Sequence, residues 1–143
     1  NMDCLGANSI STFGGNPLAA AAALANLDYL LGEDLPGNAL RQGRHLRAGL
    51  EEIAARSPLV AEVRGKGLMQ GVELVVPGGL EPNPRAATTV LEEARAGGLL
   101  LGKGGLHGNV LRLAPPLSLT REELEEGLAI LAAAIEQAGA TGT

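Results

Sequence analysis

The sequence is poor in aromatic residues, cysteine and long apolar runs. Phe13 and Tyr29 are the only aromatic residues, so the core has to be built from Ala, Leu and Val. Cys4 is the single cysteine, which excludes a disulfide within the chain and makes a cytoplasmic location the default expectation. No run of about 18 apolar residues is present, so we expect no membrane partner.

Positive charge is also scarce. The chain has 11 basic and 16 acidic side chains and a net charge of −5, which is the wrong sign for nucleic-acid binding. His45 and His107 lie far apart in the sequence, and with Cys4 they form no metal-ligand pattern. The 143 residues suffice for one domain. We therefore expect small-molecule or protein partners.

The first third of the chain reads as two helices. Asn16 before Pro17 is typical of a helix start, and leucines at helical spacing predict a helix over residues 17–31 that Gly32 ends. A second amphipathic helix is predicted to end before Ser57-Pro58. Its apolar positions are Leu40, Leu46, Leu50 and Ile53.

The remaining chain alternates between strands and helices. Strands are predicted over 59–63 and 68–76, and again over 99–101 and 110–113 on either side of a glycine-rich loop at 102–109. A helix begins after Asn83, and a capping box of Thr120 and Glu123 begins the last one. This order predicts an α+β fold, a largely antiparallel sheet with helices packed on one face.

Two segments could bind anions. In Ser11-Thr12-Phe13-Gly14-Gly15-Asn16-Pro17, hydroxyl groups and glycines directly precede a helix N-terminus, where unpaired amides attract phosphate; a simple capped loop is the alternative. The loop at 102–109 fits neither a Walker A motif nor the dinucleotide fingerprint. An ordinary hairpin loop is the favoured interpretation of that second segment.

Arg112 is a guanidinium in an otherwise apolar strand. If it is buried it needs a carboxylate partner, because an unpaired buried charge costs several kcal/mol. Three interpretations remain open at this point. Arg112 could be exposed on one face of an alternating strand, it could form an internal salt bridge, or its guanidinium could bind a ligand carboxylate in a bidentate contact.

Taken together, three motifs resemble the class III pyridoxal-phosphate aminotransferases, the group of acetylornithine, ornithine, 4-aminobutyrate and alanine–glyoxylate transaminases. The motifs are residues 11–17, Val63-Arg64-Gly65-Lys66-Gly67-Leu68-Met69, and residues 102–116. The resemblance implies the small C-terminal domain of the fold type I transferase fold. Residues 1–33 would be a phosphate-contact loop and connecting helix of the large domain, and residues 34–143 the small domain.

The resemblance also implies roles for single residues. Thr12, with Ser11 beside it, would bind the phosphate of pyridoxal 5'-phosphate in the neighbouring subunit of a homodimer. Arg112 would bind the α-carboxylate of amino acid and 2-oxo acid substrates. The family's Schiff-base lysine lies upstream of these motifs, and Lys66 and Lys103 lie in glycine-rich turns that do not suit that role.

We therefore expect the C-terminal fragment of an aminotransferase, inactive by itself. The alternative is a standalone non-catalytic domain that binds a small anion or a protein partner.

Overall fold

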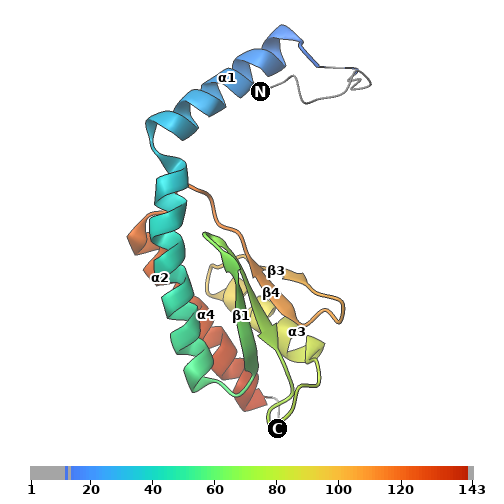
Figure 1. Ribbon diagram of the computed structural model, residues 1–143. Helices are drawn as coiled ribbons and strands as arrows, with labels where there is room; N and C mark the ends of the chain where they lie inside the picture. Colours follow the sequence, from blue (N-terminus) through green and yellow to red (C-terminus); the bar gives the residue numbers. More distant parts are fainter. Residues whose placement is uncertain (1–11, 13, 142–143) are drawn as a thin grey trace. The chain divides into compact units, whose positions relative to one another are not determined.

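The computed structural model describes residue 12 and residues 14–141. The chain divides into two compact units, Asn1–Leu35 and Pro36–Thr143. Figure 1 shows the helices and strands in chain order. They are α1 (Pro17–Gly32), α2 (Leu35–Arg56), β1 (Val60–Lys66), β2 (Met69–Leu74), α3 (Pro84–Ala96), β3 (Gly102–Gly104), β4 (Val110–Leu113) and α4 (Arg121–Thr141).

Helix α1 is the regular element of the first unit. The side-chain oxygen of Asn16 accepts a hydrogen bond of 3.0 Å from the Ala19 amide, and Pro17 occupies the first turn. This capping confirms the predicted helix start, and the helix extends one residue beyond the predicted end, through Gly32. Most of its apolar side chains are exposed, including Leu18, Leu24, Leu27 and Leu31.

The second unit is built on a four-stranded sheet in the order β1-β2-β4-β3. Every neighbouring pair is antiparallel, which confirms the predicted largely antiparallel sheet. A turn that contains Gly67, with a φ of 55°, joins β1 to β2. The positive φ is the conformation that glycine adopts without strain.

The edge strand β3 was predicted in the wrong place. Its predicted position was residues 99–101, but the residues that pair with β4 are Gly102–Gly104, inside the segment predicted to be a loop. The Leu99 amide instead donates to the Ala94 carbonyl at 2.8 Å and closes the end of α3. Glycines have low strand propensity, so only the pairing with β4 reveals this strand.

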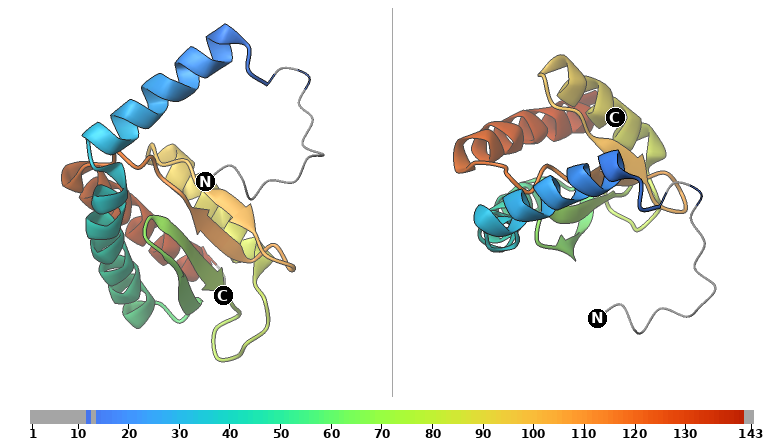
Figure 2. Two further views of the ribbon diagram at one scale, coloured as in Figure 1. Left: turned by 45° about the horizontal axis from the view of Figure 1, so that its top comes forward. Right: turned by 90° about the horizontal axis from the view of Figure 1, so that it is seen from above.

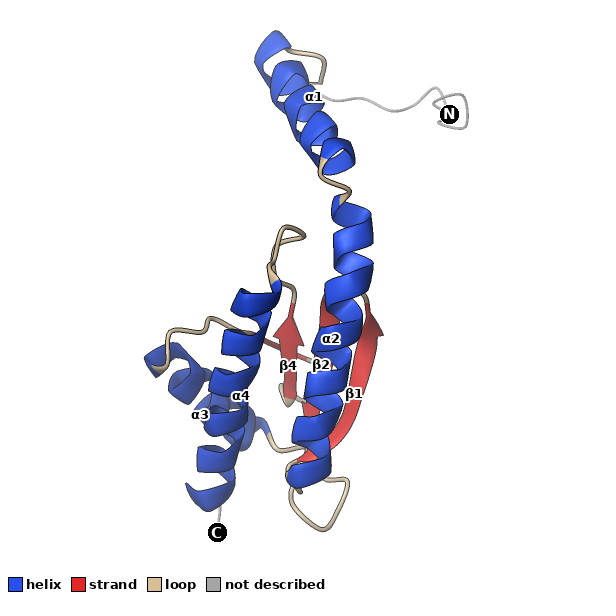
Figure 3. Cartoon of the chain, turned by 90° about the vertical axis from the view of Figure 1, so that its left-hand side faces the viewer, coloured by secondary structure: helices blue, strands red, loops and turns tan. Residues whose placement is uncertain are grey.

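Three helices cover one face of the sheet, as predicted. Figure 3 shows α3 and α4 together on the same side of β1, β2 and β4, and α3 packs along α4 (Figure 2). Side chains from α2, α3, α4 and the strands meet in one apolar core. Its most buried large members are Leu50, Leu74, Leu111, Leu131, Ile135, Val72 and Val90.

Helix α4 begins at the predicted capping box. The Thr120 amide donates to the Glu123 carboxylate at 2.9 Å, and the Glu123 amide donates to the Thr120 hydroxyl at 3.2 Å. The Thr120 hydroxyl also donates to the Glu123 carboxylate at 3.0 Å. The backbone amide and the hydroxyl of Thr120 together lower the pKa of the Glu123 carboxyl below its ordinary value. The reciprocal pair satisfies helix amides that would otherwise lack acceptors.

Candidate functional site

The face of the sheet opposite the helices, here called the open face, carries Arg112. In the strand register Arg112 lies opposite Gly71 of β2 on one side and Gly102 of β3 on the other. Paired residues of an antiparallel sheet point to the same face. Because Leu111 faces the core and is fully buried, its neighbour Arg112 faces away from the helices.

Two glycines leave the Arg112 side chain uncrowded. A Cβ built on Gly102 would lie 3.5 Å from the Arg112 Cβ and 3.7 Å from its Nε, and one on Gly104 would lie 3.9 Å from its Cδ. The aliphatic part of the Arg112 side chain therefore lies beside backbone that carries no side chains. Arg112 is exposed, and no hydrogen bond or ion pair to its guanidinium occurs within residues 14–141. The sequence left three interpretations of Arg112 open. Among the described residues Arg112 forms no salt bridge, so the interpretation as an internal salt bridge is wrong there.

A second arginine on the same face, Arg64, forms ion pairs with two glutamates. Arg64 of β1 also lies opposite Gly71, so Arg64 and Arg112 flank one glycine from the two neighbouring strands. Arg64 Nη1 lies 2.7 Å from a Glu62 oxygen and 2.5 Å from a Glu73 oxygen. The Arg64 guanidinium lowers the pKa of the Glu73 carboxyl below its ordinary value, an effect that partial burial opposes and Asn109 reinforces.

Asn109 anchors the loop that leads into β4. It is 2% exposed. Its side-chain nitrogen donates to the Leu74 carbonyl at 2.8 Å and lies 3.4 Å from a Glu73 oxygen. Its backbone carbonyl accepts from the Leu74 amide at 2.8 Å. These bonds fix the start of β4 against the end of β2, and with it the register that places Arg112 opposite Gly71.

The predicted phosphate segment belongs to the first unit. Ser11 lies outside the described residues, while Thr12 is exposed and precedes the N-terminus of α1. Gly15 has a φ of 77°, and a Cβ built on it would meet no heavy atom within 4 Å. An exposed hydroxyl, open glycine backbone and a helix N-terminus are compatible with a phosphate group. Thr12 and Arg112 belong to different units.

Both lysines of the sequence are exposed. The Lys103 ammonium donates to the Thr88 hydroxyl at 3.0 Å. A lysine that reacts with a carbonyl is normally desolvated or held beside another cation, and neither lysine has such surroundings. Within the described residues there is no group of three or more His, Cys, Asp or Glu side chains suited to a metal ion.

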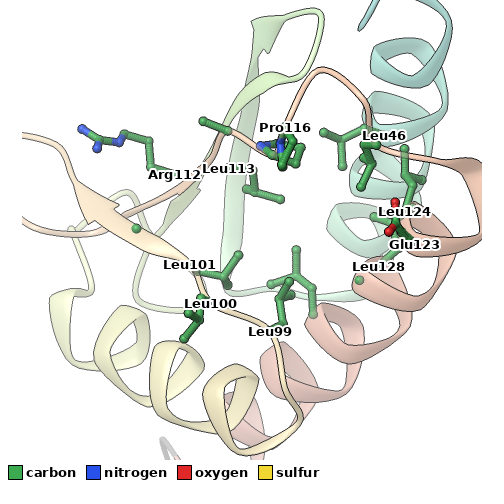
Figure 4. Close-up of a pocket in the computed structure, with 16 residues that line it drawn as sticks. Leu46, Leu99, Leu100, Leu101, Arg112, Leu113, Pro116, Glu123, Leu124 and Leu128 are labelled. Atoms are coloured by element: carbon green, nitrogen blue, oxygen red, sulfur yellow. The ribbon is translucent and has the colours of Figure 1, made fainter. Parts of the chain in front are cut away.

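A separate apolar cavity of about 480 Å³ lies between the sheet and helices α2 and α4. Figure 4 shows leucines projecting into it, while the Arg112 guanidinium points away. The residues that line the cavity include Leu46, Leu99, Leu101, Leu113, Leu124 and Leu128. Arg112 is also one of the residues that line this cavity, but its guanidinium is not directed into it (Figure 4).

Sequence reasoning missed the cluster of Arg64, Glu62, Glu73 and Asn109. The period-two spacing of Glu62 and Arg64 on one strand was an available signal, because such residues share a face. Nothing local signals that Glu73 of another strand completes the cluster, or that Asn109 is buried.

The comparisons with known proteins bear on this fold and site. The family profile described as aminotransferase class-III matches residues 3–135. This chain therefore belongs to the class III aminotransferase family, as the sequence motifs predicted. Members of this family depend on pyridoxal phosphate, and the α+β unit observed here is the C-terminal domain of their fold.

Two similar curated proteins have different reactions. A diaminobutyrate–2-oxoglutarate aminotransferase of Rhizobium meliloti is 43% identical over 135 residues, which are 90% of this chain and 29% of that protein. An alanine/serine racemase of Pyrococcus horikoshii is 40% identical over 135 residues, 94% of this chain and 28% of that protein. The chain thus spans less than a third of the length of these relatives.

Solved structures agree on the fold. A Bacillus anthracis aminotransferase superposes with a TM-score of 0.84 at 37% identity, covering 91% of this chain and 30% of that one. An Arthrobacter phospholyase, solved with phosphoethanolamine, gives 0.86 at 38% identity, with 90% and 31% covered. No described helix is long and apolar enough to cross a membrane.

Proposed function

We propose that this chain is the C-terminal part of a pyridoxal-phosphate-dependent enzyme that transfers an amino group from an amino acid or ω-amine to a 2-oxo acid. Arg112 would bind the substrate carboxylate. Ser11 and Thr12 would contact the cofactor phosphate of the neighbouring subunit in a homodimer. The cytoplasm remains the proposed location.

The observation that supports this proposal most directly is the exposure of the Arg112 guanidinium. The guanidinium is exposed on the open face between Gly71 and Gly102, without a partner among the described residues. A guanidinium offers two parallel N–H donors that match the geometry of a carboxylate. Pyridoxal phosphate, when bound, supplies the electron sink that makes an amino acid reactive at Cα; Arg112 would orient that amino acid by its carboxylate.

Arg112→Ala and Arg112→Lys in the full-length enzyme test this role. Loss of a bidentate, charge-assisted contact should raise the KM for carboxylate substrates by about tenfold or more, with the lysine variant less affected. A primary amine without a carboxylate is the matched control, and its KM should stay unchanged. An unaltered KM for carboxylate substrates contradicts the assignment.

Thr12→Val tests the phosphate contact. The substitution removes a hydroxyl and keeps the shape of the side chain, so the dissociation constant for pyridoxal phosphate should rise. Cofactor fluorescence during titration of the full-length apoenzyme measures it. The contact would cross the subunit interface, so the same protein should sediment as a dimer.

The chain by itself should transfer no amino group. The exposure of Lys66 and Lys103 supports this expectation, since neither suits covalent attachment of the cofactor. Transamination by the isolated 143-residue chain would contradict it.

Two alternatives have specific support. A standalone anion-binding or partner-binding domain fits the compact unit Pro36–Thr143, which has its own core; saturable binding of pyridoxal phosphate to the isolated chain, without the absorbance of a lysine adduct, would favour it. A different reaction of the full-length enzyme fits the similarity to a racemase and a phospholyase. Product analysis with an amino acid, with and without a 2-oxo acid, separates racemisation and elimination from transfer.

A further inference from the structure

Glu73 lies on the open face within reach of two arginines. It sits two residues beyond Gly71 on β2, opposite Glu62 of β1 and Val110 of β4. Because Arg112 lies opposite Gly71, Glu73 and Arg112 are diagonal neighbours across the β2–β4 pair. Diagonal positions are about 7–8 Å apart, a distance that Arg and Glu side chains can bridge.

On β2 the position opposite Arg112 is a glycine, so Val110 is the one residue of these paired positions whose side chain lies beside the path from Glu73 to Arg112. Gly71 has no side chain, and the atoms nearest to a Cβ built there are Val110 Cγ1 at 3.4 Å, then the Arg64 carbonyl oxygen and Arg64 Cγ. A free carboxylate at Glu73 would therefore have Arg112 as an accessible cation. If Arg112 formed this ion pair, its guanidinium could not bind a substrate carboxylate in a bidentate contact.

The structure instead engages Glu73 with Arg64. Arg64 Nη1 lies 2.5 Å from Glu73 Oε2, and Asn109 lies 3.4 Å from Glu73 Oε1. The Glu73 side chain is 31% exposed and that of Arg64 44%, so the pair is partly shielded from water. Both oxygens of the carboxylate are thus directed to partners other than Arg112.

We propose that Arg64 is a positioning residue that holds Glu73 away from Arg112 and so keeps Arg112 free for the substrate carboxylate. This inference rests on the carboxylate-binding role proposed for Arg112. Arg64 itself would touch neither substrate nor cofactor and would act only through Glu73.

A purely structural role for Arg64 has to be separated from this one. Glu62 and Glu73 lie directly opposite each other, and like charges in that arrangement destabilise a sheet. Arg64 bridges both carboxylates and offsets their repulsion. Removing either glutamate relieves the repulsion equally, but only removal of Glu73 abolishes the competitor for Arg112.

The experiment uses the full-length enzyme with three variants: R64Q, R64Q/E73Q and R64Q/E62Q. KM and kcat are measured for a carboxylate substrate and for an amine without a carboxylate. The dissociation constant of propionate, followed by cofactor absorption, gives a readout independent of turnover. Melting temperatures of the two double variants control for stability.

We expect R64Q to raise the KM for the carboxylate substrate and the propionate dissociation constant by about fivefold, the scale of a partly exposed ion pair. Neither kcat nor the KM for the amine should change. R64Q/E73Q should restore both constants, while R64Q/E62Q should not. If R64Q alone does not fold, the comparison of the two double variants decides the question.

Three results would overturn the inference: unchanged carboxylate affinity in R64Q, an equal rise for both substrates, or equal recovery in both double variants. Arg112→Ala distinguishes this failure from failure of the proposed function. If Arg112→Ala weakens carboxylate binding and R64Q does not, only the positioning role of Arg64 is lost.

Discussion

Gly43 of α2 lies directly against Gly67 in the turn between β1 and β2. A Cβ built on Gly43 would come within 2.5 Å of the Gly67 carbonyl carbon and 2.6 Å of its Cα. The obstacle is backbone, which cannot rotate away as a side chain would. This contact brings α2 onto the motif of residues 63–69, and it requires glycine in the middle of a helix.

Gly43→Ala should therefore destabilise the fold, although alanine favours helices. Overpacking of this kind costs about 1–3 kcal/mol, measured as the free energy of unfolding in urea. Gly127→Ala in α4 is the matched control, because its Cβ would meet only Leu99 Cδ1 at 3.8 Å. That control should be neutral or stabilising by up to about 1 kcal/mol. Similar stability changes in the two variants would refute the close-contact argument.

Asn109→Ala should lower the free energy of unfolding by about 1–3 kcal/mol, since it removes the donor to the buried Leu74 carbonyl. Asn109→Asp keeps the shape but replaces the donor by a negative charge beside Glu73. At neutral pH this second variant should be the less stable of the two. A milder effect of Asn109→Asp than of Asn109→Ala would show that the hydrogen bond to Leu74 is not what stabilises the loop.

The ion pair of Glu73 predicts sensitivity to acid. Its pKa is lower in the folded chain than the ordinary 4.5, chiefly through the hydrogen bond from Arg64. The stabilisation is therefore complete above that ordinary value and is lost as the pH falls through the folded pKa. Urea unfolding from pH 7 down to about pH 3 should show a smaller loss of stability in Glu73→Gln than in the native sequence. Parallel curves would mean that Glu73 makes no such contribution.

Two leucines of α2 test where the core lies. Leu50 is 1% exposed and Leu40 is 56% exposed. Leu50→Ala leaves a cavity and should cost about 2–5 kcal/mol. Leu40→Ala should change the free energy of unfolding by roughly 0.5 kcal/mol or less. Equal losses in the two variants would contradict the burial of this helix face.

Much of the fold could be predicted locally. Asn16, Asn83 and Thr120 each precede a helix that begins where a side-chain cap predicts it, because capping depends on residues within one turn. The edge strand could not be predicted, since Gly102–Gly104 form it only through pairing with β4. The apolar residues 99–101 had suggested a strand three residues too early.

For the candidate site, too, the sequence predicted some features and the tertiary structure decided others. The motifs pointed to Ser11, Thr12 and Arg112 as functional residues, and those roles stay predictions. That Arg112 lies exposed between Gly71 and Gly102, and that Arg64 engages Glu73, follows from the register of three strands. Helix starts depend on residues within one turn, and composition and the family motifs can be taken directly from the order of the residues. The sequence by itself therefore determined these features. Which charges meet and which stays free depends on residues far apart in the chain, and only the tertiary structure brings those residues together.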